Sequence, residues 1–191
     1  MLGAFAAVAA GSFKFDGTIH IIDEYPPKDR IIEMVYGLDW GWTNPACIVA
    51  IGLDGDNRAY ILEEFYQNRI STATIIREIK NMQKRWGEGT IVCDRSEPKS
   101  INDLIDKGLD AIADASKRED GIRELGSRFE DPGDGNPRIY VHKDCVNWIS
   151  EVQTYDQNKK QQDHAMDATR YALTNQIQSN VEISFGRRDR Y

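Results

Sequence analysis

The 191-residue sequence has no uninterrupted run of the ~20 apolar residues that a membrane-spanning helix requires. With a mean hydropathy of -0.57, the sequence predicts a protein that has no membrane partner. It also has few cysteines, and none belongs to a Cys-x-x-Cys pair or lies beside paired histidines. Neither a zinc site nor a disulfide framework is therefore indicated, and a reducing cytoplasm is expected. The three cysteines are Cys47, Cys93 and Cys145.

The sequence also lacks a secretory signal of the usual form. Residues 1–11 are apolar but contain no basic residue, and the run is short. We interpret residues 1–12 as a buried strand or a junction with a preceding domain. The length suits one hydrophobic core, so residues 1–178 are predicted to form a single domain and residues 179–191 a tail.

An excess of positive charge is missing as well. The chain has 24 Lys and Arg against 31 Asp and Glu, a formal net charge of -7. Binding of nucleic acid by bulk electrostatics is therefore excluded, and DNA contacts would have to come from local basic patches. The alternative for each patch is an ordinary solvated charged face. The candidate positions are Lys80, Lys84, Arg85, Lys159, Lys160, Arg187, Arg188 and Arg190.

The first half of the chain has the pattern of an antiparallel strand meander. Apolar runs cover residues 34–38, 46–53 and 59–66, and an Asp-Gly turn separates the last two. An amphipathic crossover helix follows, capped by Ser71 or Thr72 and ended by Gly87. Its apolar positions recur at helical spacing, at Ile75, Ile76, Ile79, Met82 and Trp86.

The second half alternates short strands with helices. Strands are predicted at residues 90–93, 109–115 and 139–141, and helices after Ser96 and Pro98, around residues 122–129, at 148–155 and at 163–178. Such alternation joins parallel strands by right-handed crossovers. The predicted fold is therefore α/β, a mixed central sheet with an antiparallel meander and parallel strands, flanked by helices.

Three acidic residues are the candidate catalytic positions. Asp39 ends the first strand of the meander, Asp94 ends the strand after the crossover helix, and Asp167 lies early in the last helix. Ligands of such sheets bind beyond the carboxyl ends of the strands, where the first two fall. Carboxylates that meet there repel one another and favour a cation, and oxygen ligands suit Mg²⁺ or Mn²⁺. Two ions about 4 Å apart can hydrolyse a phosphodiester without a protein nucleophile.

Two neighbours of Asp167 are possible accessory residues. Asp163 lies one helical turn before Asp167, and His164 lies three residues before it. His164 is a candidate second-metal ligand, water-orienting group or phosphate contact. The alternative is a helix N-terminus with acids that favour the dipole, and for Asp163 we prefer that interpretation. Trp40 and Trp42 are interpreted as core or rim packing.

Three motifs together resemble the nuclease domain of tailed-bacteriophage large terminase subunits. They are Tyr36-Gly37-Leu38-Asp39-Trp40-Gly41, then Cys93-Asp94 before Ser96-Glu97-Pro98-Lys99-Ser100-Ile101, and Asp163-His164-Ala165-Met166-Asp167-Ala168-Thr169-Arg170-Tyr171-Ala172-Leu173. The last motif is the most specific. The similarity runs from about residue 13 to about residue 174.

The resemblance implies a ribonuclease H-like fold of the resolvase-integrase superfamily and a two-metal endonuclease that cuts concatemeric double-stranded viral DNA during packaging. It implies Asp39, Asp94 and Asp167 as metal ligands, with His164 matching an accessory metal-site histidine found in some members. The implied partners are double-stranded DNA, a terminase ATPase domain, the portal and the small terminase subunit, in the host cytoplasm. No Gly-x-x-x-x-Gly-Lys-[Ser/Thr] loop occurs here, so the motor would be separate.

Two other functions compete with the nuclease. The Asp39-Trp40-Gly41 turn followed by a hairpin also resembles the first phosphate loop of sugar kinases and actin-like ATPases, but the second glycine-rich loop which that function needs is not visible. A non-catalytic module that docks on the packaging motor would have the same acids as a solvated rim, and it predicts no metal dependence.

Overall fold

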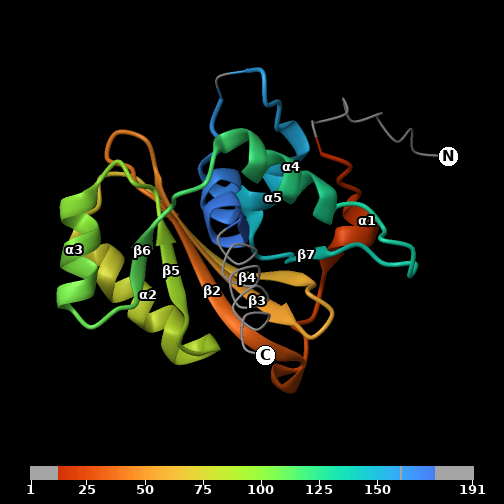
Figure 1. Ribbon diagram of the computed structural model, residues 1–191, viewed down its shortest axis with the longest axis horizontal. Coiled ribbons are helices and arrows are strands. Elements are labelled where there is room, and N and C mark those ends of the chain that lie inside the picture. The colour runs from red at the N-terminus through yellow and green to blue at the C-terminus, as the bar shows by residue number, and fades with distance from the viewer. Residues whose placement is uncertain (1–12, 160, 175–191) are drawn as a thin grey trace, which may run out of the picture.

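The computed structural model describes residues 13–159 and 161–174, which form a seven-stranded mixed sheet with helices on both faces (Figure 1). The strand order is β1-β7-β4-β3-β2-β5-β6. Only β3 runs against the others in this sheet, because it pairs antiparallel with both β2 and β4 while the remaining pairs are parallel. The strands are β1 (Ile21–Ile22), β2 (Ile31–Asp39), β3 (Ala46–Asp54), β4 (Ala59–Gln67), β5 (Thr90–Cys93), β6 (Ala111–Ala113) and β7 (Ile139–His142).

One face of the sheet is covered by the crossover helix α2 (Thr72–Trp86) and by α3 (Pro98–Asp106). Alternate strand residues such as Tyr36 and Ile48 point to this side and pack with Ile79 of α2 and Leu104 of α3. Because side chains alternate between the faces of a strand, the intervening residues form a second core on the other side.

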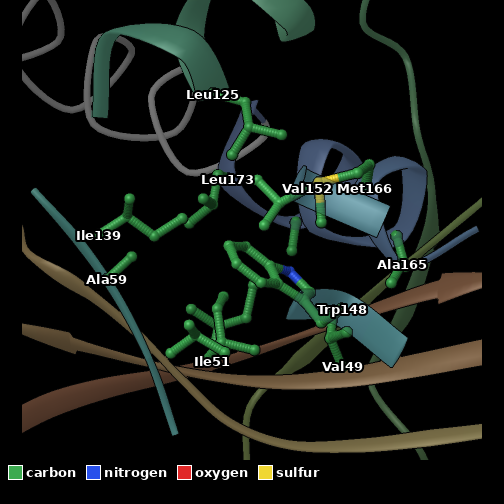
Figure 2. Packing of buried hydrophobic residues seen from close by; sticks show 14 of the residues in the cluster. Val49, Ile51, Ala59, Leu125, Ile139, Trp148, Val152, Ala165, Met166 and Leu173 are labelled. Carbon is green, nitrogen blue, oxygen red and sulfur yellow. The ribbon is translucent and has the colours of Figure 1, made fainter. Parts of the chain in front are cut away.

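The second core lies under α4 (Arg118–Arg128), α5 (Val146–Thr154) and the last helix, of which residues 164–174 are described. Trp148 of α5 is fully buried at the centre of this core, between Val49 of the sheet and Met166 of the last helix (Figure 2). Its indole nitrogen donates a hydrogen bond of 2.8 Å to the hydroxyl of Thr169, so the ring joins α5 to the last helix.

Most of the predicted architecture is confirmed. The meander forms with Asp39 opposite Cys47 on β3, and the mixed sheet flanked by helices is the predicted fold class. Ser71 is the residue that caps α2, since its side chain accepts a hydrogen bond from the backbone N–H of Thr74. The strand predicted at residues 109–115 is shorter, because only Ala111–Ala113 pairs with β5.

Four local features differ from the predictions. Helix α1 (Gly17–His20), strand β1 and the 3-10 turn η1 (Lys28–Arg30) were not anticipated. The prediction that Ser96 caps α3 is wrong, because the residue before the helix is Glu97 and the Ser96 side chain is bonded elsewhere. The predicted apolar segment at residues 1–12 and the tail at 179–191 lie outside the described residues. None of the helices within 13–159 and 161–174 is long and apolar enough to cross a bilayer.

Candidate active site

Asp39 and Asp94 lie side by side at one edge of the sheet. Strands β2 and β5 are parallel, and Leu38 is paired with Cys93, so the next residue on each strand is an aspartate. The pairing continues beyond the strand ends, because the N–H of Asp94 donates to the carbonyl oxygen of Leu38 at 2.9 Å. The indole nitrogen of Trp40 donates to the carbonyl oxygen of Asp94, also at 2.9 Å. Two backbone-anchored contacts therefore hold the two aspartates together.

Gly37 allows the last helix to approach the same place. A Cβ atom on Gly37 would lie 1.9 Å from the carbonyl oxygen of Ala168, so only glycine permits this contact. Because residues two apart on a strand share a face, Asp39 is the next side chain on the face that the helix covers. Asp167 immediately precedes Ala168 in the sequence, so the contact places the third aspartate close to the end of β2.

A direct bond joins the last helix to Asp39. Nδ1 of His164 lies 2.8 Å from Oδ2 of Asp39, which is only 8% exposed. Burial raises the pKa of Asp39 to about 6; the bond from His164 opposes this rise, and the charges of Asp167 and Asp94 add to it. The same bond raises the pKa of His164. Asp94 and Asp167 thus both lie within electrostatic range of Asp39.

The other two carboxylates each have a partner of their own. The hydroxyl of Ser96 donates to Oδ2 of Asp94 at 2.7 Å, and the Ser96 N–H donates to Oδ1 at 3.1 Å. Arg170, which is 5% exposed, donates from Nε and Nη2 to Oδ1 of Asp167 at 3.1 and 3.0 Å. Each of these two carboxylates therefore has a hydrogen-bond donor that offsets the repulsion from neighbouring carboxylates.

The residues fit a divalent cation by their chemistry. Three carboxylates supply the oxygen donors that Mg²⁺ and Mn²⁺ prefer. Burial raises the pKa of Asp39, and the charges of Asp167 and Asp94 act in the same direction. In the described part of the chain, no three His, Cys, Asp or Glu side chains are yet gathered closely enough to hold an ion. Asp94 and Asp167 are hydrogen-bonded to Ser96 and Arg170, so a cation would compete with these two donors for the carboxylates.

Two glutamates that the sequence analysis did not identify hold the helices next to the site by capping their first turns. Oε2 of Glu151, a residue of α5 that is 6% exposed, accepts the N–H groups of Ala165 and Met166 at 2.7 and 3.2 Å. Glu151 therefore caps the helix that carries His164 and Asp167, and its Oε1 accepts from Tyr66 at 2.7 Å. Glu64 of β4 caps α5 in the same way, accepting from the N–H of Trp148 at 2.8 Å.

Asp163 immediately precedes the last helix. Its carbonyl oxygen accepts the N–H of Asp167 at 2.7 Å, the first turn of the helix. The carboxylate lies 3.5 Å from a guanidinium nitrogen of Arg118, at the start of α4. Burial raises the pKa of Asp163, and the charge of Asp167 acts in the same direction. A structural role at the helix start accounts for these contacts.

The predicted DNA-binding residues of α2 lie away from the carboxylates. Lys84 and Arg85 are at the end of α2 that leads into the start of β5, whereas Asp94 follows the end of β5. Arg85 forms an ion pair with Glu63 at 2.5 Å, and Lys80 donates to the carbonyl oxygen of Lys107 at 2.8 Å. In the loop before the last helix, Lys159 is paired with Asp156 at 2.9 Å. Lys160, Arg187, Arg188 and Arg190 are outside the described residues.

The sheet order, the single antiparallel central strand and the helices on both faces define a ribonuclease H-like α/β fold. Asp39 and Asp94 lie beyond the carboxyl ends of two neighbouring parallel strands, where open α/β sheets bind their ligands. The sequence profile of the Terminase RNaseH-like domain family matches residues 36–176, and the chain belongs to this family. No curated protein sequence matches the chain at a significant level.

Solved structures of phage large terminases share the fold. The large terminase of a thermophilic bacteriophage, also solved with ADP, superposes with a TM-score of 0.75 at 19% identity over 85% of this chain and 44% of that one. The nuclease domain of the SPP1 large terminase with bound Mn gives 0.62 and 21%, covering 83% and 96%. The large terminase nuclease of the thermophilic phage G20c with bound magnesium gives 0.59 and 18%, covering 86% and 90%. The chain thus spans less than half the length of the first of these proteins.

Proposed function

We propose that this chain is a metal-dependent endodeoxyribonuclease that cuts concatemeric double-stranded viral DNA during genome packaging. The observation that carries the proposal is the pair Asp39 and Asp94 at the ends of two hydrogen-bonded parallel strands, with the helix of Asp167 packed on Gly37 beside them. Family membership and the metal-bound SPP1 and G20c nucleases support it.

In this proposal Asp39, Asp94 and Asp167 hold two divalent cations, Mg²⁺ or Mn²⁺, with His164 as a further ligand. When bound, such ions lower the pKa of water and offset the charge of a phosphodiester. Water then adds to phosphorus and the bond to the 3'-oxygen breaks, which leaves 3'-hydroxyl and 5'-phosphate ends.

The chain's own contribution is to hold these groups in place. The bond between Nδ1 of His164 and Asp39 fixes the imidazole, so that its Nε2 atom is left for a ligand or a proton. Ser96 fixes the carboxylate of Asp94, and Arg170 fixes that of Asp167. Fixed carboxylates need little rearrangement when charge develops on the substrate.

We further propose an ATPase motor domain, the portal and the small terminase subunit as partners in the host cytoplasm. The ADP complex of the thermophilic-phage large terminase supports an ATPase partner. Double-stranded DNA is the proposed substrate.

The test compares the purified protein with Asp94→Asn, using supercoiled plasmid and Mn²⁺ or Mg²⁺, with EDTA as the metal-free arm. Conversion to nicked and linear DNA should fall by more than about 100-fold in the variant, because even the loss of an outer-sphere partner of a metal costs 10- to 100-fold. Asp106→Ala is the matched control: it removes the same charge from an exposed position at the end of α3.

The ends of the product give a second measurement. Linear products should be religated by a DNA ligase without prior phosphorylation, as 5'-phosphate and 3'-hydroxyl ends require. Equal cutting by the native protein and Asp94→Asn, or cutting that persists in EDTA, would contradict the proposal. A docking module predicts no cutting under any of these conditions.

A further inference from the structure

A groove of about 280 Å³ begins next to the two strand-end aspartates. One wall is the loop that follows Asp39 and includes Trp40 and Trp42; the other is formed by the first turns of α2 and α3, with Ser96 between β5 and α3. The groove therefore lies on the side of the sheet that α2 and α3 cover, and it adjoins the candidate active site through Ser96, whose hydroxyl is bonded to Asp94.

The side chain of Trp42 stands out into solvent at this place. Trp42 is 66% exposed, although two contacts fix the backbone of its loop. A Cβ atom on Gly41 would lie 2.3 Å from the carbonyl oxygen of Pro45, so the turn is tight, and the N–H of Arg69 donates to the carbonyl oxygen of Trp42 at 2.9 Å. The backbone is thus held while the indole remains uncovered.

Trp40 differs from Trp42 in this respect. Its indole nitrogen is bonded to the carbonyl oxygen of Asp94 and the ring packs against the core under α2 and α3. The interpretation of both tryptophans as packing residues therefore suits Trp40. For Trp42 the ring is exposed on a fixed loop close to the acidic site, where it is available for contact with another molecule.

The polar lining of the groove complements a phosphate chain. Thr72 Oγ1 and Ser100 Oγ lie 3.5 Å apart, where α2 of 15 residues and α3 of 9 residues begin. Helix N-termini carry partial positive charge and hydroxyls donate to phosphate oxygens. Arg95 is exposed on the turn before α3 and Lys99 is exposed in its first turn, while Glu97 is the acidic residue in the groove lining. An aromatic face next to phosphate donors matches the alternation of sugar and phosphate in a nucleic acid strand.

We propose that this groove holds the DNA strand beside the phosphate to be cut, with Trp42 packed against the sugar and base of a flanking nucleotide and Thr72 and Ser100 donating to its phosphate. The inference rests on the proposed nuclease function and names residues that bind its substrate. Trp42 acts in binding and takes no part in bond breaking.

The experiment measures kcat and KM for Mn²⁺-dependent cutting of a labelled DNA duplex, and its Kd by fluorescence anisotropy in the Asp94→Asn background. Trp42→Ala should raise KM and Kd by between about five- and 100-fold, the range for loss of one aromatic–base contact, with kcat within about twofold. Trp42→Phe should recover most of the affinity. Ile32→Ala is the control, because Ile32 is an apolar residue that is 71% exposed near the start of β2, the end opposite to the loop of Trp42, and it should leave all three constants unchanged.

The outcomes separate this inference from the proposed function. If Asp94→Asn abolishes cutting but Trp42→Ala leaves KM and Kd unchanged, the groove does not hold DNA and the nuclease proposal stands. A fall in kcat alone also overturns the inference, because it assigns Trp42 to the reacting site. If the native protein neither binds nor cuts the duplex, both proposals fail.

Discussion

Replacing Gly37 with alanine would insert a methyl group into the contact between β2 and the last helix. The new Cβ would lie 1.9 Å from the carbonyl oxygen of Ala168 and 2.5 Å from its carbonyl carbon. Both atoms belong to the helix backbone, so no side-chain rotation can relieve the clash. Because ordinary contact begins near 3.4 Å, the helix has to retreat by about 1.5 Å.

The retreat should affect both stability and activity. Overpacking of this kind costs about 1–3 kcal/mol of unfolding free energy, and each kcal/mol lowers Tm by roughly 2–4 °C in a chain of this size. The same movement carries His164 away from Asp39, whose 2.8 Å bond it would break. A displacement of about 1 Å at a reacting centre costs about 100-fold in rate.

Thermal unfolding and Mn²⁺-dependent plasmid cutting measure the two effects. Gly55→Ala is the matched control, since nothing lies within 4 Å of a Cβ atom in the β3–β4 turn, and it should unfold and cut like the native protein. Unchanged Tm and unchanged cutting in Gly37→Ala would refute the close approach of the last helix. A loss of stability with full activity would refute the idea that this approach assembles the site.

Three further outcomes follow from buried groups. Glu151→Ala should lower the unfolding free energy in urea by about 3 kcal/mol and Glu151→Gln by less, because alanine leaves two N–H groups and the Tyr66 hydroxyl unpaired. Arg170→Met should lower the unfolding free energy by about 3 kcal/mol, because it leaves Asp167 without its guanidinium partner. Mn²⁺ should raise the Tm of this variant more than that of the native protein, because the cation no longer competes with the guanidinium for Asp167. An equal rise in Tm would contradict this. Burial raises the pKa of all three cysteine thiols. A thiol reagent at pH 8 should therefore modify none of them in the folded protein and all of them after unfolding. Rapid labelling of the folded protein would contradict their burial. These thiols are Cys47, Cys93 and Cys145.

The sheet could be predicted from the sequence because its strands and helices carry local signals. On α2 the apolar positions at helical spacing include Ile75, Ile79 and Met82, and all three are buried. The Asp-Gly turn fixes the antiparallel pairing of β3 and β4. Strand β1, by contrast, is two residues long and pairs with β7 more than a hundred residues later, so no local pattern marks it.

The candidate site was predictable where its residues end strands. Asp39 and Asp94 follow apolar runs, and parallel strands that are neighbours bring their carboxyl ends to one edge. The misassigned Ser96 shows the limit of such local rules. A serine two residues before a proline has the form of a helix cap, whose hydroxyl would accept from a backbone N–H, but the Ser96 hydroxyl instead donates to the charged carboxylate of Asp94.

The supporting residues were not predictable, because their roles depend on contacts between distant parts of the chain. Glu151 has the form of an ordinary polar position of an amphipathic helix, and its role appears only when the first turn of the last helix is seen against it. Arg170 is the exception, because it lies three residues after Asp167 on the same helix, a spacing at which ion pairs form. Gly37 did carry a signal, as part of Gly-x-Asp-x-Gly, but its reason appears only when Ala168 is seen against it.

These supports explain how a chain with a net charge of -7 tolerates three neighbouring carboxylates. Asp39 is bonded to a histidine, Asp94 to a hydroxyl and Asp167 to an arginine, so each like charge is offset by a different kind of donor. The three donors also differ in how strongly they resist displacement, since a guanidinium carries full charge whereas a hydroxyl carries none. Asp94 should therefore be the easiest of the three for a cation to engage and Asp167 the hardest.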